Sequence, residues 1–269
     1  MAVLHEVERV RHEVRLRTLE VAKVNNLTPR MIRVTFTGPD LEGFVSLGPA
    51  DHIKVFFSPA GAEPVLPELG PEGVRWPEGK QRPEARDYTP RRYDSAAGEL
   101  DIDFVVHGDG PASSWASQAQ PGDKLAIGGP RGSRLVPDDF DYYVLLGDET
   151  TLPAIGRHLE ELPASSRVIV LLEVADAAEE QSLANRDSVE VRWLHRDGAE
   201  PGSTELLLSA LRELKLPDGD GYFFAAGEAG TLRPIRRYLA DELGANKDWT
   251  SISGYWKRGT ANHDHHEPI

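Results

Sequence analysis

The hydrophobic pattern of the chain changes at Asp141, and this change limits the possible folds more than any other feature. From there DYYVLLGDE is a nearly continuous apolar run, typical of a strand buried on both faces of a parallel sheet. The next segment, TTLPAIGRHLEELP, has a helical period that Thr150 or Thr151 is expected to cap. Strand and helix patterns then alternate, which predicts a doubly wound parallel-sheet domain. The apolar stripe of the first helix is Leu152, Ile155, Leu159 and Leu162.

Before residue 135 the chain instead shows about six short segments in which apolar and polar positions alternate. Turn residues separate them, and the pairs Asn25-Asn26 and Gly38-Pro39 are expected to interrupt the first strands. Such spacing predicts a small, closed, six-stranded antiparallel barrel. The segments are RLRTLEVAKVNNLTP, RMIRVTFTGPD, DHIKVFFSP, RDYTPRRYD, ELDIDFVVHG and DKLAIGGPRG.

The two patterns meet at LVPDDFD, residues 135–141. We therefore assign residues 1–137 to a β-barrel domain and residues 138–269 to an α/β domain. Residues 58–85 are rich in Pro, Gly and Glu and have no clean period, which predicts a long excursion between two barrel strands.

The composition excludes several classes of function. Thirty Lys and Arg against 44 Asp and Glu give a net charge of −14, which disfavours nucleic acid and anionic membranes as partners. There is no cysteine, which removes disulfides, thiolate metal sites and cysteine nucleophiles and fits the reducing cytoplasm. The N-terminus has no apolar signal region, and no apolar run approaches about 18 residues. We expect a soluble cytoplasmic protein.

The stretch RDYTPRRYD, residues 86–94, combines arginine, tyrosine and threonine within nine residues. Arginine suits phosphate, tyrosine offers a flat face, and threonine offers a hydroxyl for a ring heteroatom. The stretch therefore fits an aromatic ring joined to a phosphate, or equally an exposed ladder of charges. In a regular strand one face carries Arg86, Tyr88, Pro90 and Arg92, and the other carries Asp87, Thr89 and Arg91. A turn or bulge at Pro90 would alter this register.

Two further stretches are candidates for phosphate binding. In HGDGPASSWASQA, residues 107–119, a glycine-rich turn enters a helix, and such a turn presents free N–H groups to a pyrophosphate or is an ordinary helix start. GDETTLPAI, residues 147–155, lies where the first strand of the α/β half meets its helix, which is where such sheets bind ligands. It is not a G-x-G-x-x-G fingerprint, so a plain helix cap stays open as well.

At this point the residues resemble a known family, the siderophore-interacting proteins, which are flavin-dependent ferric-siderophore reductases of the ferredoxin-NADP reductase superfamily. RDYTPR is similar to that family's Arg-x-Tyr-Thr-x-Arg flavin motif. The resemblance runs in the family's order from about residue 16 to residue 259. Its further blocks are DHIKVFF, DFVVHGDGPASSWA, GPRGS, GDETTLPAI, AAGE and GYWKRG.

The resemblance implies a flavin-binding barrel, a nicotinamide-binding α/β domain and bound FAD. Tyr88 would lie against the isoalloxazine ring and Thr89 near its polar edge, with arginines towards phosphate. Asp148, Glu149, Thr150 and Thr151 would sit where the two domains meet, and Tyr255 and Trp256 would approach the flavin. The other residues implied to hold FAD are Arg86, Arg91, His107, Gly108, Gly110, Pro111, Ala112, Ser114 and Trp115.

The implied reaction is reduction of the iron in a ferric siderophore. A nicotinamide donates a hydride to the flavin, and the flavin can pass electrons singly to Fe(III). Reduction loosens the iron, because oxygen chelators hold Fe(III) far better than Fe(II), and no protein ligand to the metal is needed. Lys54, Arg131 and Lys257 match family positions that resemble a basic patch for an anionic ferric chelate, with Arg134 and Arg258 nearby.

The electron donor and the exact activity stay open. Without G-x-G-x-x-G the donor is NADH, NADPH or reduced ferredoxin, although two acidic proteins would repel each other. The alternatives to a ferric-siderophore reductase are a general flavin reductase or diaphorase, and a non-catalytic siderophore-binding protein.

Four other residues or groups are set aside. The tail histidines fit a flexible polar tail better than a metal site. Trp193 and His195 fit a half-buried strand end at least as well as a contact to adenosine. Glu173 is interpreted as a surface residue or a ribose-binding acid. The tail residues are His263, His265 and His266.

Overall fold

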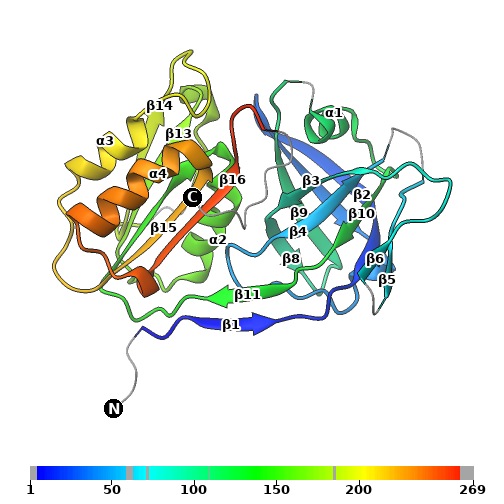
Figure 1. Ribbon diagram of the computed structural model, residues 1–269, viewed down its shortest axis with the longest axis horizontal. Helices are drawn as coiled ribbons and strands as arrows, with labels where there is room; N and C mark the ends of the chain where they lie inside the picture. The colour runs from blue at the N-terminus through cyan, green and yellow to red at the C-terminus, as the bar shows by residue number, and fades with distance from the viewer. Residues whose placement is uncertain (1–4, 59–62, 71–72, 109, 184–185, 261–269) are drawn as a thin grey trace. The chain divides into compact units, whose positions relative to one another are not determined.

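The computed structural model of the chain describes residues 5–58, 63–70, 73–108, 110–183 and 186–260. The chain divides into two compact units, Arg9–Ser133 and Arg134–Ile269, and Met1–Glu8 belongs with the second. Each unit has its own strands and its own core (Figure 1).

Seven antiparallel strands of the unit Arg9–Ser133 form one sheet in the order β7-β4-β10-β2-β3-β9-β8. Only Thr89 separates the two edge strands β7 and β8, so both edges meet at this residue and the sheet curls into a barrel. Because residues 84–94 supply both edges, they count as one strand of the predicted six, and the predicted barrel is confirmed. The strands are β2 (Leu16–Thr28), β3 (Met31–Thr37), β4 (Ile53–Phe57), β7 (Glu84–Tyr88), β8 (Pro90–Asp94), β9 (Glu99–Val105) and β10 (Lys124–Gly128).

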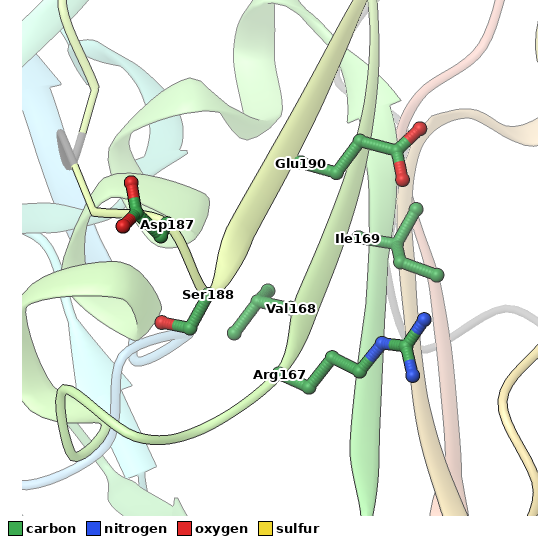
Figure 2. Close-up of a pocket in the computed structure, with 6 residues that line it drawn as sticks. All are labelled: Arg167, Val168, Ile169, Asp187, Ser188 and Glu190. Atoms are coloured by element: carbon green, nitrogen blue, oxygen red, sulfur yellow. The ribbon is translucent and has the colours of Figure 1, made fainter.

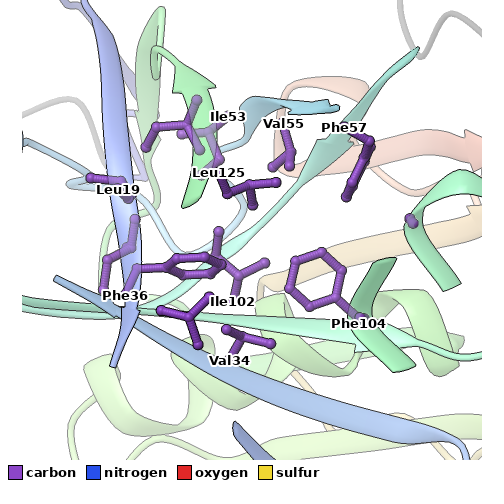
Figure 3. Close-up of a cluster of buried hydrophobic side chains, with 14 of the residues drawn as sticks. Leu19, Val34, Phe36, Ile53, Val55, Phe57, Ile102, Phe104 and Leu125 are labelled. Carbon is purple, nitrogen blue, oxygen red and sulfur yellow. The ribbon is translucent and has the colours of Figure 1, made fainter. Parts of the chain in front are cut away.

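Side chains from alternate positions of these strands fill the barrel (Figure 3). Phe36 of β3 and Ile102 and Phe104 of β9 are completely buried, and Ile53 and Leu125 complete the cluster from β4 and β10. Burying one such side chain contributes about 1.5–3 kcal/mol, so this cluster is a principal reason for the closed shape.

One local expectation for the barrel is wrong, and a bulge that was considered at Pro90 is present. The strand β2 continues through Asn25 and Asn26, because these residues pair with Arg33 and Ile32 of β3, and the chain turns only at residues 29–30. In β8 the register shifts between Pro90 and Arg92, which is a bulge. Pro90 therefore faces Ile102 whereas Arg92 faces Asp101, and Arg92 does not share a face with Pro90.

Small elements complete this unit. The excursion at residues 58–85 contains a two-stranded sheet of β5 and β6, and a second such sheet pairs β1 with β11. The expected break at Gly38-Pro39 is confirmed, since β3 ends at Thr37 and a 3₁₀ turn follows. The elements are β1 (Glu8–Arg11), η1 (Pro39–Leu41), β5 (Glu68–Gly70), β6 (Gly73–Arg75), α1 (Pro111–Gln118) and β11 (Gly132–Leu135).

The second unit contains five parallel strands in the order β14-β13-β12-β15-β16. The first strand lies in the middle and the chain winds outward from it in both directions, as predicted for a doubly wound sheet. The strands are β12 (Tyr142–Asp148), β13 (Val168–Val174), β14 (Val189–His195), β15 (Gly221–Glu228) and β16 (Thr250–Trp256). The helices are η2 (Glu149–Thr151), α2 (Leu152–Glu161), η3 (Ala177–Glu179), α3 (Leu206–Glu213), α4 (Ala229–Arg237), η4 (Tyr238–Glu242) and η5 (Lys247–Trp249).

Helices cover both faces of this sheet (Figure 1). On one face Phe223 of β15 packs with Leu207 of α3 and Leu232 of α4. On the other, the His158 ring of α2 lies 5.0 Å from the ring of Phe224, the next residue of β15. The predicted apolar stripe of α2 is buried. Within the described ranges no helix is long and apolar enough to cross a membrane.

Candidate functional site

The two edge strands β7 and β8, which are joined at Thr89, position the residues predicted to hold the flavin ring and its phosphates. Tyr88 is half-buried, and its ring centroid lies 4.7 Å from that of Phe104. Burial raises the pKa of the Tyr88 hydroxyl, so it stays a neutral hydrogen-bonding group. Thr89 is buried at the junction of the strands, while Arg86 and Arg91 on either side are half-buried. The guanidinium of Arg86 donates to the Ala85 carbonyl at 2.7 Å.

The turn into α1 positions the predicted pyrophosphate-binding residues. Pro111 opens the helix and Gly110 is its N-cap residue, so no side chain caps the first N–H groups. The Ser113 hydroxyl ties the turn together, because it accepts from the His107 N–H at 3.0 Å and is 2.9 Å from the His107 carbonyl. Gly108 has a φ of 52°, a left-handed conformation that favours glycine.

The barrel residues fit the chemistry of FAD. A Cβ at Gly108 or Gly110 would meet no protein atom within 4 Å, so there is space beside this turn. The open first turn of α1 offers N–H donors and the positive end of a helix dipole. Trp115 of α1 and Tyr88 of β7 both pack on Phe104, so a single aromatic cluster joins the two predicted parts of the site. Ala112 is buried in that core and Ser114 is exposed.

The sequence analysis did not identify two features of the proposed FAD cradle, which is formed by residues 84–94 and by the turn into α1. It singled out Ser114 but not Ser113, whose buried hydroxyl fixes the turn. It also missed the aromatic support of Tyr88 by Phe57 and Phe104. The only available signal was the apolar alternation of β4 and β9, which predicts burial but no partner.

In the second unit the predicted residues lie at the carboxyl end of the central strand β12. Asp148 caps the short turn η2, because its carboxylate accepts from the Thr150 N–H at 3.0 Å. Thr151 is the N-cap residue of α2, but its side chain makes no capping hydrogen bond. The Thr151 hydroxyl instead donates to the carbonyl of Ala226 on β15 at 3.0 Å, and so joins η2 to this strand. The expected position of a threonine cap is therefore confirmed at Thr151, but the expected side-chain capping bond is made one turn earlier, by Asp148 to η2.

Asp148 also binds the end of β16. Its Oδ2 accepts from the Trp256 indole N–H at 2.8 Å and from the Glu228 backbone N–H at 3.0 Å. Burial raises the pKa of Asp148 to about 6, and the Glu149 carboxylate raises it as well, whereas the bonds from Thr150 and Trp256 lower it. The structure thus brings two predicted residues, Asp148 and Trp256, into direct contact.

A buried charge cluster lies at the same edge of the sheet. The Arg196 guanidinium, which follows β14, binds both carboxylate oxygens of Glu149, one of them at 3.0 Å. Glu173 at the end of β13 is 3.6 Å from Arg196 and accepts from the Thr204 hydroxyl at 2.6 Å. Glu173 is 2% exposed, so the interpretation of it as a surface residue is wrong. Arg196, Thr204 and Glu228 were not predicted, because only the strand order brings them to this edge.

The predicted substrate cations differ in their surroundings. Lys54 lies in the barrel unit and forms an ion pair with Asp87 at 2.7 Å. Arg131, also of that unit, is exposed. Lys257 belongs to the other unit and is half-buried just beyond β16. Of the nearby arginines, Arg134 donates to the Asp248 carbonyl at 3.2 Å.

The residues set aside stay outside the candidate site. His195 is 2.8 Å from Glu180, and Trp193 is half-buried on β14. His263, His265 and His266 lie outside the described residues. Over the ranges that the structure covers, no three histidine, aspartate or glutamate residues are grouped to hold a metal.

A hollow in the second unit lies at the wrong edge of the sheet for the candidate site (Figure 2). It is lined by residues at the amino ends of β13 and β14, whereas sheets of this kind bind ligands at the carboxyl ends. We assign it no role. Its lining is Arg167, Val168, Ile169, Asp187, Ser188 and Glu190.

An antiparallel barrel followed by a doubly wound parallel sheet defines the ferredoxin-reductase-like fold class, and the barrel here carries an open helix N-terminus and an Arg-Tyr-Thr strand. Within this class, residues 20–134 match the siderophore-interacting FAD-binding domain and residues 140–259 match the siderophore-interacting protein domain. The chain belongs to the siderophore-interacting protein family.

Three similar proteins support this assignment. An NADPH-dependent ferric-chelate reductase of Escherichia coli is 38% identical over 93% of this chain and 96% of its own. Ferric vibriobactin reductase ViuB of Vibrio cholerae is 36% identical over 98% of this chain and 96% of its own. The crystal structure of a siderophore utilization protein from T. fusca has 46% identity and a TM-score of 0.89, and covers 97% of this chain and 99% of that one.

Proposed function

We propose that this chain is an FAD-dependent reductase that transfers electrons from NAD(P)H through the flavin to Fe(III) in a siderophore and so releases Fe(II). One observation carries the proposal. The barrel offers a cradle suited to FAD in a chain that matches, along both halves, proteins named as reductases of ferric chelates.

Each barrel residue has a defined task in this proposal. Tyr88 supports the ring of FAD from the aromatic cluster, and Thr89 donates or accepts at its polar edge. The first turn of α1 and the arginines of β7–β8 hold the pyrophosphate. Bound FAD supplies the conversion of a two-electron donor into a source of single electrons, which suits Fe(III). We assign FAD binding in this unit to Arg86, Tyr88, Thr89, Arg91, His107, Gly108, Gly110, Pro111, Ala112, Ser114 and Trp115.

The residues at the carboxyl end of β12 and the end of β16 complete the proposed cofactor-binding set. Glu149, Thr150 and Thr151 follow Asp148 at the switch point of the sheet, where ligands of doubly wound folds bind. Functionally we divide the chain into an FAD-binding part, residues 1–137, and an NAD(P)-binding-like part, residues 138–269. The contributors from the second part are Asp148, Glu149, Thr150, Thr151, Tyr255 and Trp256.

The substrate is a ferric siderophore, and Lys54, Arg131 and Lys257 are proposed to attract its anionic chelate. Cations are needed because the whole chain carries −14 and repels such a substrate. The iron stays within its own oxygen ligands, so the protein supplies charge and position instead of metal ligands. The absence of cysteine supports a place in the cytoplasm.

Anaerobic flavin spectroscopy tests this function. The purified chain, loaded with FAD, is mixed in turn with NADH, NADPH and reduced ferredoxin, and the flavin absorbance is followed. We expect bleaching by a nicotinamide, then reoxidation by an Fe(III) catecholate siderophore with Fe(II) trapped by a ferrous chelator. A chain that binds no flavin overturns the proposal.

Two comparisons separate the alternatives. Faster turnover with quinones than with ferric siderophores, unaffected by Lys257→Ala, would identify a general flavin reductase. Tight binding of the chelate with no trapped Fe(II) would identify a siderophore-binding protein. Bleaching by ferredoxin alone would change the donor but leave the acceptor as proposed.

A further inference from the structure

The strand β16 forms an edge of the sheet in the second unit and ends at Trp256, one residue before Lys257. Its partner is β15, and the register shifts between Gly227 and Glu228, so that Trp256 faces Glu228. Beyond this point the chain turns back, because the Thr260 N–H donates to the Lys257 carbonyl at 3.0 Å. The ladder of the sheet therefore does not fix Lys257, and other contacts must do so.

Two buried carboxylates hold the residues on either side of Lys257. Asp148 accepts the Trp256 indole N–H at 2.8 Å. Glu228, which is 5% exposed, accepts the Arg258 backbone N–H at 3.0 Å with its Oε1. Asp148 also accepts the Glu228 backbone N–H at 3.0 Å, so the two acids form one unit. We call Asp148 and Glu228 the carboxylate clamp.

Glycines close the remaining space around the clamp. Gly202 has a φ of 69°, and a Cβ there would lie 2.6 Å from the Glu228 Cγ and 3.2 Å from the Trp256 Cη2. A Cβ at Gly227 would lie 2.6 Å from the Asp148 Oδ2. The backbone thus packs tightly against both acids and the indole, and Trp256 has little freedom to move.

The charges of the clamp are turned inward. Asp148 accepts four hydrogen bonds, and the second oxygen of Glu228 accepts the Thr231 N–H at 2.7 Å. The Lys257 ammonium, by contrast, forms no ion pair with a residue that the structure describes. Its neighbours are therefore held while its own charge is available to an anion.

We propose that Asp148 and Glu228 are positioning residues that hold Trp256 and Arg258 and thereby fix the Lys257 ammonium for an anionic ferric chelate. This inference rests on the substrate role proposed above for Lys257. The two acids act through hydrogen bonds to its neighbours and do not themselves touch the chelate.

The direction of the change in the chelate KM distinguishes a positioning role of the two acids from a purely electrostatic one. Glu228→Gln removes a negative charge, which by charge alone would strengthen binding of an anionic chelate and lower its KM. Loss of the hydrogen bonds that position Lys257 would instead weaken binding and raise the KM. We expect Glu228→Gln and Asp148→Asn to raise the KM for an Fe(III) catecholate siderophore about fivefold to tenfold, which corresponds to about 1–1.4 kcal/mol.

Steady-state kinetics on the FAD-loaded full chain tests this, with a neutral quinone as the second acceptor. We expect turnover of Glu228→Gln with the quinone to change little. Asp148→Asn is compared only by the ratio of its chelate KM to its quinone KM, because Asp148 also belongs to the proposed cofactor-binding set. Glu213→Gln on the exposed side of α3 is the matched control, because it removes one negative charge far along the chain from the clamp. Gly202→Ala is an independent variant, because its Cβ would displace Glu228 and the Trp256 ring while both carboxylates keep their charge.

Double variants decide the outcome. If the clamp acts through Lys257, Glu228→Gln has no further effect on the chelate KM in a Lys257→Ala background. A KM that falls or stays constant in the clamp variants, while Lys257→Ala raises it, overturns the clamp alone. No effect of Lys257→Ala on the chelate overturns the substrate role of that lysine. Should Glu228→Gln fail to fold because it also caps α4, Gly202→Ala and Asp148→Asn give the same test.

Discussion

Lys54 shares its charge with a neighbouring carboxylate. Asp87 of β7 lies opposite Lys54 of β4 in the ladder, and their side chains form an ion pair at 2.7 Å. A lysine held in this way attracts an anionic chelate less strongly than an unpaired one. Lys54 could be singled out from the sequence, whereas its partner Asp87 is identified only by the pairing register of β4 and β7.

We therefore predict that Asp87→Asn lowers the KM for an Fe(III) catecholate siderophore about twofold to fivefold, since both the removed charge and the released ammonium favour the anion. Steady-state assays at low and high salt measure this, and the gain should shrink with salt. Asp94→Asn, at the half-buried end of β8, is the control, because it also removes one acid that pairs with a cation. An unchanged or raised KM would count against a substrate role for Lys54.

His158 is a buried neutral histidine. It is 2% exposed and packs on Phe224, and burial together with the nearby Arg157 lowers its pKa to about 3. In the unfolded chain its pKa is near the ordinary histidine value of 6.5. Below pH 6.5 the unfolded state therefore binds a proton that the folded state does not, and acid favours unfolding.

We predict that His158→Leu removes this part of the acid sensitivity. Between pH 6.5 and 4.5 the wild-type chain should lose up to about 3 kcal/mol of unfolding free energy more than the variant, at 1.36 kcal/mol per pH unit. Urea unfolding of both proteins across this range gives the difference. Parallel loss of stability in the two proteins would show that His158 is not the group responsible.

At the scale of elements, the turn before α1 depends on one hydroxyl. Ser113 joins the His107 backbone to the first turn of the helix. We predict that Ser113→Ala weakens FAD binding about threefold to tenfold, because the turn no longer holds the helix N–H groups in place, at a cost of about 1–2 kcal/mol in stability.

Fluorescence titration of the apoprotein with FAD measures this affinity. Ser117→Ala, four residues later on an exposed face of α1, is the matched control and should bind FAD as the wild-type chain does. Equal losses in both variants would mean that α1 as a whole, and not this turn, is sensitive.

The sequence was sufficient to predict most elements but not their irregularities. Periodicity predicted the strands of the barrel and the helix α2, because burial on one face leaves a repeating pattern. The bulge before Arg92 and the continuation of β2 through Asn25 depend on pairing with other strands. The cluster of Glu149, Glu173 and Arg196 required the order of three strands, which no local pattern contains.

At the scale of the whole molecule, the resemblance and the two hydrophobic patterns were enough to predict the two-part architecture. They could not predict which partners each charged side chain binds. Asp148 was predicted as a cofactor contact, and the structure adds that it accepts hydrogen bonds from Thr150, Glu228 and Trp256. Which partners a carboxylate binds depends on how the strands pair, and the sequence does not contain this pairing directly.

Two separate cores predict that FAD binding stabilises the molecule unevenly. At a concentration one hundred times the Kd, a ligand adds about 2.7 kcal/mol to the state that binds it. We expect FAD to slow hydrogen exchange in residues 84–94 and 105–115, with no change in β13. Exchange followed by mass spectrometry measures this. Riboflavin, which lacks phosphate, should protect residues 105–115 less, and equal protection would contradict the pyrophosphate site at α1.

The connection of the two edge strands through Thr89 has a consequence for where the chain could be circularly permuted. In a circular permutant with new ends at residues 78–80, every strand pair of the barrel keeps its connections, because these exposed positions lie outside the strands. New ends at Thr89 would instead remove the single covalent link between β7 and β8. Because β7 and β8 are the two edges of the sheet, they could then separate and pair with other chains, and the proposed ring-binding residues would be divided between the two termini.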